Sequence, residues 1–325
     1  MNHTLLEASR INVVRKDPGG GEKKLIDELS FSLDRGQTLG IVGESGSGKS
    51  ILVSAIMHIL PRTCMLKSGK IFFEGDDLYQ VSRDHLDTIR GFQIAMISDN
   101  PLEILDPICT VEKQVRETIM AHNPGMSKNA VIERGLSIFK SLRMPDPEKM
   151  MHSYPYQLSG GMKQRVAIAL ALCGDVKLLI ADDATRSLDV TVAAQIVEIL
   201  RKMKQDSQLS MIWISNSLPV CSLLAERIMI MYGGKILEIG PKETILRSPR
   251  HFYTEKMLQV TPKSKGFERD QKFKGFRVKT GGTAQNNESG CEFSAICDHA
   301  RDRCSVSSPE LKQIGEGHRC RCHFV

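Results

Sequence analysis

The chain has 325 residues, with 44 Lys and Arg against 38 Asp and Glu, a formal net charge of +6 and 41% hydrophobic residues. This composition is that of a soluble globular protein, and the length suffices for one large α/β domain with attachments or for two modest domains. No apolar run approaches the roughly 18 residues that cross a bilayer, and the first residues lack the apolar core of a secretion signal, so we expect neither a membrane-spanning nor an exported protein. The charge excess is mild, so we predict no nucleic-acid partner and interpret the basic stretch 263–279 as a solvated linker.

Strands and helices alternate along most of the chain. A helix is predicted over 49–60, and helical apolar spacing from about 100 to 165 predicts a separate helical lobe. Strands are predicted at 5–14, 25–33, 38–43, 69–75, 92–97, 177–182, 209–214, 226–232 and 235–239. This order predicts a mostly parallel sheet with helices on both faces. A glycine-rich and polar stretch, 275–290, is interpreted as a linker to a small cysteine-rich end.

A phosphate-binding loop is predicted between the third strand and the first helix. The stretch GESGSGKS, Gly43 to Ser50, matches the pattern G-x-x-x-x-G-K-S in that context. Backbone N–H groups of such a loop surround phosphate oxygens, the lysine adds a point charge, and the serine can ligate Mg²⁺. The residues expected to bind ATP are Gly43, Ser45, Gly46, Gly48, Lys49 and Ser50. The alternative is a glycine-rich turn with a chance lysine.

Two acids follow the strand KLLIAD. Asp182 ends that strand and can hold the water shell of Mg²⁺, although a strand-end aspartate can also be merely solvated. Further on, LSGGM at 158–162 and SLD at 187–189 make the chain resemble the nucleotide-binding subunit of an ATP-binding cassette (ABC) transporter. The stretch RSPRHFYTEKML and the cysteine-rich tail resemble the dipeptide, oligopeptide and nickel import branch of that family.

The resemblance implies an α/β fold: a P-loop NTPase of the ABC type with an antiparallel β subdomain, an inserted α-helical subdomain and a small cysteine-rich C-terminal region. We expect the ATPase core at 1–98 and 166–250, the helical subdomain at 99–165, and the C-terminal extension at 251–325. The resemblance also implies partners: a sister ABC ATPase, two transmembrane permeases and an extracytoplasmic substrate-binding protein. The chain would then dock on the cytoplasmic face of the cell membrane.

In this family two cassettes pair head to tail, and each ATP on one phosphate loop is capped by the other subunit's LSGG segment. Here the capping residues would be Ser159, Gly160 and Gly161, at the start of a helix predicted over 162–172. The hydroxyl, the backbone N–H groups and the helix dipole all favour a phosphate. Read without the other motifs, LSGG is a helix N-cap followed by a turn.

Several residues depart from the family pattern where the attacked phosphate is handled. Asp183 stands where a glutamate usually polarises water, and it is one methylene shorter. Asn216 stands at the switch histidine; an amide donates a hydrogen bond but carries no proton. Asp99 stands at the Q-loop glutamine, or Asn100 after a one-residue slip, and a carboxylate there repels the γ-phosphate unless Mg²⁺ intervenes.

The adenine-stacking aromatic that ends the first strand in this family is also missing. The nearest matches are Val14 and Arg15, and the guanidinium plane of Arg15 could stack on adenine. Each departure alone could be drift in an active enzyme. Together they predict a site that holds Mg-ATP but cleaves it slowly or not at all, in a heterodimer whose competent site this chain completes through LSGGM. The alternative is a non-transport, nucleotide-dependent regulatory or binding module of the ABC type.

The cysteine-rich end predicts a metal or cluster site. Its candidate ligands are Cys291, Cys297, Cys304 and Cys322, the last chosen over Cys320 because the family's fourth cysteine precedes a histidine. Four thiolates can hold a [4Fe–4S] cluster, which the resemblance to the import branch favours. Zn²⁺ is the alternative, since it takes the same ligands, although the short C-x₂-C pairs of zinc ribbons are missing.

Overall fold

The computed structural model describes residues 3–259 and 290–325, which form two compact units. The predicted linkers at 263–279 and 275–290 lie outside the described residues, apart from Gly290. Unit 1 comprises the residues up to Leu6 together with Ser32–Gln37 and Phe72–Ile214. Unit 2 comprises Glu7–Phe31, Thr38–Ile71 and Ser215–Val325. The boundaries proposed from the sequence at 98, 165 and 250 stay a prediction.

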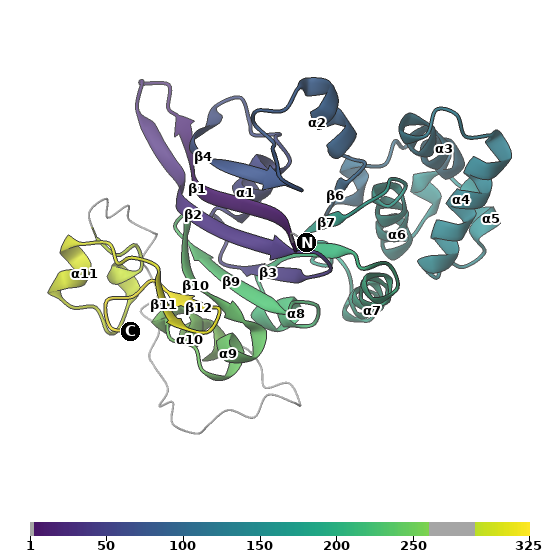
Figure 1. Ribbon diagram of the computed structural model, residues 1–325. Coiled ribbons are helices and arrows are strands. Elements are labelled where there is room, and N and C mark those ends of the chain that lie inside the picture. Colours follow the sequence, from purple (N-terminus) through teal and green to yellow (C-terminus); the bar gives the residue numbers. More distant parts are fainter. Residues whose placement is uncertain (1–2, 260–289) are drawn as a thin grey trace. The chain divides into compact units, whose positions relative to one another are not determined.

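Unit 2 contains the first strands and the C-terminal region (Figure 1). Its strands are β1 (Thr4–Lys16), β2 (Glu22–Asp34), β3 (Thr38–Val42), β4 (Cys64–Phe73), β9 (Arg227–Tyr232), β10 (Lys235–Pro241), β11 (Lys312–Gly315) and β12 (His318–Cys320), the first, second and fourth running partly into unit 1. Its helical segments are α1 (Lys49–Ile56), α8 (Leu218–Ser222), α9 (Lys242–Arg247), α10 (Phe252–Gln259), η3 (Ser294–Ile296) and α11 (Asp302–Val306).

Two sets of strands organise unit 2. One has the order β2-β1-β4, and the other has the order β11-β12-β10-β9-β3. In the second set β3 and β9 are parallel, whereas β10 runs antiparallel to β9 and to β12. Every residue of β3 is buried, as expected for a parallel strand that is covered on both faces. The antiparallel β12 brings the end of the chain onto β10.

Unit 1 contains a parallel sheet edge and the helical lobe. Its strands are β5 (Asp76–Asp77), β6 (Ile94–Ser98), β7 (Leu178–Asp182) and β8 (Ser210–Ser215), of which β6, β7 and β8 are adjacent and parallel. Its helical segments are α2 (Arg83–Ile89), η1 (Pro101–Glu103), α3 (Val111–His122), α4 (Lys128–Ser141), α5 (Pro147–His152), η2 (Pro155–Gln157), α6 (Gly160–Ala171) and α7 (Val190–Ser207). The predicted parallel pairing is therefore confirmed for β3 and β6–β9.

The helical lobe is built from α3, α4, α5 and α6, which lie side by side (Figure 1). Side-chain oxygens of Thr110, Ser127 and Ser159 cap the starts of α3, α4 and α6 by accepting backbone N–H bonds. Such caps satisfy donors that have no partner within the helix. Ile119 and Phe139 are fully buried inside the lobe. The helices that the apolar spacing predicted are confirmed, whereas their forming a separate lobe stays a prediction.

Two predicted helix boundaries differ from the structure. The helix predicted over 49–60 ends at Ile56, because His58 has a left-handed φ of 53° that stops the helix. The helix predicted over 162–172 begins at Gly160, since Ser159 already caps it. Across the part of the chain that the structure describes, no helix has the length and hydrophobicity to traverse a bilayer.

Candidate functional site

The phosphate loop links β3 to α1 within unit 2. Lys49 is 6% exposed, and its Nζ donates to the carbonyls of Gly43 at 2.7 Å and Glu44 at 2.8 Å and to Ser47 Oγ at 3.3 Å. The loop therefore wraps around the ammonium group. Ser45, Gly46 and Ser50 are exposed. This arrangement places backbone N–H groups, a fixed positive charge and a hydroxyl on one short segment, which is what a nucleotide phosphate chain with Mg²⁺ requires.

Close backbone packing explains the glycines of this loop. A Cβ atom on Gly43 would lie 2.4 Å from the carbonyl oxygen of Met231. Gly48 has a φ of 101°, and a Cβ atom there would lie 3.0 Å from the carbonyl oxygen of Leu25. Any other residue at either position would push the loop away from strands β2 and β9. The glycine spacing that identified the motif is therefore also a packing requirement in this protein.

The acids that follow β7 lie in unit 1. Asp182 ends the strand, half-buried. Asp183 adopts a left-handed φ of 50°, and its N–H donates to the carbonyl of Ile214 at 3.1 Å. Its carboxylate lies 3.8 Å from the guanidinium of Arg186, which is largely exposed. The two acids that the sequence placed side by side thus have different backbone conformations, and the second is tied to β8.

Hydrogen bonds tie the segment Ser98–Asp99 to the SLD stretch and to α6, all within unit 1. Ser187, in the SLD stretch, donates its hydroxyl to the carbonyl of Asp99 at 2.7 Å. Gln164, on the helix that LSGGM begins, donates its Nε2 to the carbonyl of Ser98 at 2.9 Å. Gln164 is fully buried, and no sequence pattern predicted that it would hold the Ser98 carbonyl. The segment after β6 is therefore held by side chains from both α6 and the SLD loop.

The LSGGM segment has the geometry of a capped helix start. Ser159 accepts the N–H of Met162 at 3.4 Å. Ser159 and Gly160 are exposed, and a Cβ atom on Gly160 would meet nothing within 4 Å. A Cβ atom on Gly161, by contrast, would lie 2.6 Å from Cγ1 of Val192 on α7. The open side of this helix start can receive an anion, and its other side is packed on α7.

Arg15 and Asn216 both belong to unit 2 and both are exposed. The guanidinium of Arg15 donates to Asp17 Oδ1 from Nε at 3.3 Å and from Nη2 at 3.2 Å. Stacking on adenine would require Arg15 to turn away from this exposed pair, which costs little. Asn216 directly follows β8. The roles predicted for these two residues stay predictions.

The four cysteines predicted as ligands line one cavity. Cys291, Cys297, Cys304 and Cys322 line a hollow whose free space, open solvent included, is about 310 Å³, together with aromatic side chains. Cys320 is fully buried on β12 and is not part of that wall. Burial raises the pKa of Cys291 to about 11 and also raises the pKa of Cys297 and Cys322, and the neighbouring thiols add to each shift. Cys322, chosen over Cys320 because it precedes a histidine, is thus the one of the two that lines this cavity, and its role as a ligand stays a prediction.

The same thiols do not form a site for one ion. Within residues 3–259 and 290–325, no group of three or more His, Cys, Asp or Glu side chains is arranged to hold a single metal ion. Tetrahedral zinc needs its thiolate sulfurs about 2.3 Å from one point. The metal or cluster site predicted from the sequence is therefore not seen as a formed site among the described residues.

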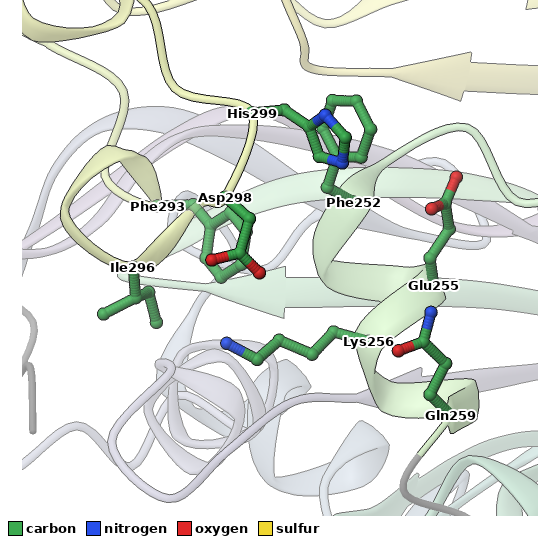
Figure 2. Close-up of a pocket in the computed structure, with 8 residues that line it drawn as sticks. All are labelled: Phe252, Glu255, Lys256, Gln259, Phe293, Ile296, Asp298 and His299. Carbon is green, nitrogen blue, oxygen red and sulfur yellow. The ribbon is translucent and has the colours of Figure 1, made fainter. Parts of the chain in front are cut away.

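A second hollow, of about 290 Å³ with open solvent included, is lined by residues of α10 and of the cysteine-rich end (Figure 2). Phe252 of α10 and His299 of the tail stack there with ring centroids 3.9 Å apart. Phe293 lines both this hollow and the cysteine cavity. The cysteine-rich end is therefore packed on α10, the helix formed by the stretch FYTEKMLQ.

Comparisons with known proteins identify the family. The family described as "ABC transporter" matches residues 26–186, and "Oligopeptide/dipeptide transporter, C-terminal region" matches residues 237–304. The dipeptide transport ATP-binding protein DppD of Escherichia coli is 35% identical over 301 residues, covering 93% of this chain and 91% of that protein. The oligopeptide transport ATP-binding protein OppD of Bacillus subtilis is 42% identical over 244 residues, covering 75% and 68%.

Solved structures share the fold at lower identity. The dimeric ATP-binding cassette MJ0796, in a post-hydrolysis state bound to ADP and Pi, has a TM-score of 0.65 at 23% identity, covering 73% of this chain and 99% of that one. The cbiO1 structure from Clostridium perfringens has a TM-score of 0.64 at 23% identity, covering 79% and 99%. The predicted P-loop NTPase fold with an antiparallel β subdomain and a helical part is confirmed. The chain belongs to the ABC transporter family of ATP-binding proteins, in the branch with the oligopeptide/dipeptide transporter C-terminal region.

Proposed function

We propose that this chain is the energy-coupling, ATP-binding subunit of an importer for peptides or related small solutes, and that its own ATP site is catalytically impaired. The relatives named for dipeptide and oligopeptide transport support the cargo class. Two permeases and an extracytoplasmic binding protein would complete the importer. Docking on the permeases would hold the chain at the cytoplasmic face of the cell membrane.

The groups that bind the phosphates and Mg²⁺ are complete. Family membership implies ATP and Mg²⁺, and the loop around Lys49 supplies the charge and the N–H groups for the phosphates. Ser50 and Asp182 supply a hydroxyl and a carboxylate, the hard oxygen donors that Mg²⁺ prefers. The bound Mg²⁺ would offset charge on the β- and γ-phosphates. None of these phosphate- and Mg²⁺-binding residues departs from the family pattern; the adenine-stacking aromatic is the one nucleotide-binding group that does.

The backbone at Asp183 is the observation that carries the impaired site. Its φ of 50° and its N–H bond to Ile214 fix where the side chain starts. The backbone is held in place, so the aspartate carboxylate stays one methylene short of where a glutamate carboxylate would lie. A misplacement of about 1 Å can slow a reaction roughly a hundredfold. Arg186 faces the same carboxylate at 3.8 Å, but this largely exposed side chain contributes little to holding it in place.

The other departures act in the same direction. Asn216 can donate to a γ-phosphate but cannot exchange a proton with it. The backbone of Asp99 is held by Ser187, so its carboxylate remains where the family has a neutral amide. A sister ATPase would therefore supply the productive site, which Ser159, Gly160 and Gly161 of this chain would complete. The result is an asymmetric heterodimer with one retained ATP and one that is hydrolysed.

The test is to co-express the chain with its permeases and sister ATPase and to measure ATP turnover by the assembled complex. We expect the loss of the sister's phosphate-loop lysine to abolish turnover, while Lys49→Ala leaves measurable turnover. We also expect the double change Asp183→Glu with Asn216→His to raise turnover in a complex whose sister site is blocked. Rapid ATP hydrolysis by the purified chain alone, dependent on Asp183, would contradict the impaired site.

We propose further that the cysteine cavity holds a [4Fe–4S] cluster on Cys291, Cys297, Cys304 and Cys322. The support for this proposal is that the four thiols line one hollow, because four thiolates are the usual ligands of such a cluster; Zn²⁺ takes the same ligands and is the alternative. The bound cluster would supply four iron–thiolate bonds and so cross-link a short tail. Burial favours the protonated thiols, so cluster assembly would have to release their protons.

Iron analysis and visible absorbance of anaerobically purified protein test the cluster. We expect about four irons per chain and a broad visible band, both lost in Cys297→Ser. Cys64→Ser, at a cysteine outside the cavity, is the matched control and should keep both. One zinc per chain with no visible band would identify the alternative metal instead.

A further inference from the structure

A tyrosine of the C-terminal extension contacts the phosphate loop. The backbone N–H of Glu44, the second residue of the GESGSGKS loop, donates to the hydroxyl of Tyr253 at 3.3 Å. Tyr253 lies on α10, 209 residues further along the chain, and is 2% exposed. A buried hydroxyl at this position fixes the point where the chain leaves β3 and enters the loop.

The ring of Tyr253 is part of an aromatic cluster that reaches the cysteine-rich end. Its centroid lies 5.1 Å from that of Tyr232 on β9 and 5.2 Å from that of Phe293. Tyr232 and Phe293 also meet edge to face, with centroids 5.7 Å apart. Tilted and edge-to-face pairs at these distances are favourable and resist rotation of the rings. Phe293 therefore restricts where the Tyr253 hydroxyl can go.

The contact between Phe293 and Tyr253 connects the phosphate loop to the cysteine-rich end. Phe293 lies between Cys291 and Cys297 in the sequence, is 2% exposed and lines the cysteine cavity as well as the hollow drawn in Figure 2. Burial raises the pKa of Tyr253 well above its ordinary value, and the nearby Glu44 carboxylate adds a smaller contribution in the same direction. The hydroxyl therefore stays neutral throughout the physiological pH range.

We propose that Tyr253 is a positioning residue for nucleotide: its hydroxyl holds the entry of the phosphate loop, and Phe293 extends this support to the cysteine-rich end. Lys49 Nζ donates hydrogen bonds to the carbonyls of Gly43 and Glu44, at the start of the same loop. A shift of the Glu44 peptide therefore also shifts the lysine that meets the phosphates. The proposal rests on Mg-ATP binding by this loop and is independent of the impaired hydrolysis and of which metal the cysteines hold.

Tyr253→Phe in the full-length chain removes one oxygen and keeps the ring. We expect its Mg-ATP dissociation constant to rise about two- to tenfold, the loss of one hydrogen bond. Tyr232→Phe is the matched control, because it removes a hydroxyl from the same cluster but not the bond to Glu44; its affinity should change less than about twofold. Equilibrium binding of Mg-ATP and thermal unfolding without nucleotide are measured on each variant.

The link to the cysteine-rich end is tested by Phe293→Leu alone and combined with Tyr253→Phe. If Phe293 acts through Tyr253, the double variant binds Mg-ATP no more weakly than Tyr253→Phe. A folded Tyr253→Phe protein with a lower melting temperature and unchanged Mg-ATP affinity would overturn the positioning role. If Tyr253→Phe does not fold, unchanged affinity in Phe293→Leu overturns the proposal. A wild-type chain that binds no Mg-ATP would instead refute nucleotide binding itself.

Discussion

The phosphate loop and the cysteine-rich end both surround a space for a charged group, but they are built differently. The loop is one continuous segment whose backbone and single lysine do the binding. The cysteine-rich end gathers side chains from distant positions, and its own packing depends on β12 pairing with β10. The position and geometry of a contiguous backbone motif can therefore be predicted from the sequence. For a site assembled from separate side chains, only the types of the ligands can be predicted.

The largest effect should come from the buried pair that attaches β12 to β10. His318 Nε2 lies 2.8 Å from Glu238 Oε1, and the two side chains are 6% and 0% exposed. The same carboxylate accepts the N–H groups of Arg250 at 2.7 Å and His251 at 3.1 Å. His318→Ala leaves a buried carboxylate short of one partner, so we expect a loss of about 3 kcal/mol in the free energy of unfolding.

Urea unfolding of His318→Ala measures this loss. His152→Ala is the matched control, because the side chain of His152 is 77% exposed, and it should change stability by less than about 0.5 kcal/mol. Equal stability of the two variants would mean that the cysteine-rich end is held without this pair. The comparison with the phosphate loop would then lose its basis, since the tail would not depend on distant side chains.

The second effect is on the pH dependence of stability. Burial lowers the pKa of His251 to about 4 from 6.5, against the opposing effect of the Glu238 carboxylate. Between these values the unfolded chain binds a proton that the folded chain excludes. The free energy of unfolding is therefore unaffected above pH 6.5 and falls as the pH falls toward 4. Fully developed, the loss is on the order of 3 kcal/mol.

His251→Asn isolates this contribution. In the wild type, His251 Nδ1 accepts the N–H of Tyr253 at 3.0 Å. The asparagine amide oxygen can accept the same N–H, but the amide does not titrate. We expect the stability of this variant to depend less on pH between 6.5 and 4 than that of the wild type, measured by denaturant unfolding at a series of pH values. His152→Asn should keep the wild-type slope. Equal slopes in all three proteins would show that another group governs acid unfolding.

The third effect concerns the loop itself. Lys49→Ala removes the charge that the loop encloses, and hydrogen bonds to charged groups contribute about 1.5–3 kcal/mol. We expect Mg-ATP affinity to fall about a hundredfold, with little change in the cysteine-rich end. Lys24→Ala, at a side chain that is 66% exposed in the same unit, should bind normally. An equal loss in both variants would mean that net charge, not the loop, governs binding.

The contrast between loop and tail also marks what the sequence could predict. The strand and helix order and the loop at Gly43–Ser50 followed from local patterns, and the structure has them where expected. The bond from Glu44 to Tyr253 did not, because no local pattern links residues 209 positions apart. The φ of 50° at Asp183 was equally unpredicted, since few non-glycine residues adopt it and no local pattern marks it.

The smallest effect separates backbone strain from close packing within the loop. Gly48 (φ 101°) and Gly20 (φ 82°) both have backbone conformations that alanine resists, so Gly48→Ala and Gly20→Ala share that cost. Only at Gly48 would the new Cβ also meet a neighbour, the carbonyl oxygen of Leu25 at 3.0 Å; at Gly20 nothing lies within 4 Å. We therefore expect Gly48→Ala to be about 1 kcal/mol less stable than Gly20→Ala, by urea unfolding. Equal losses would mean that β2 yields to the added methyl, and the close packing assigned to the phosphate loop would then not be one of its requirements.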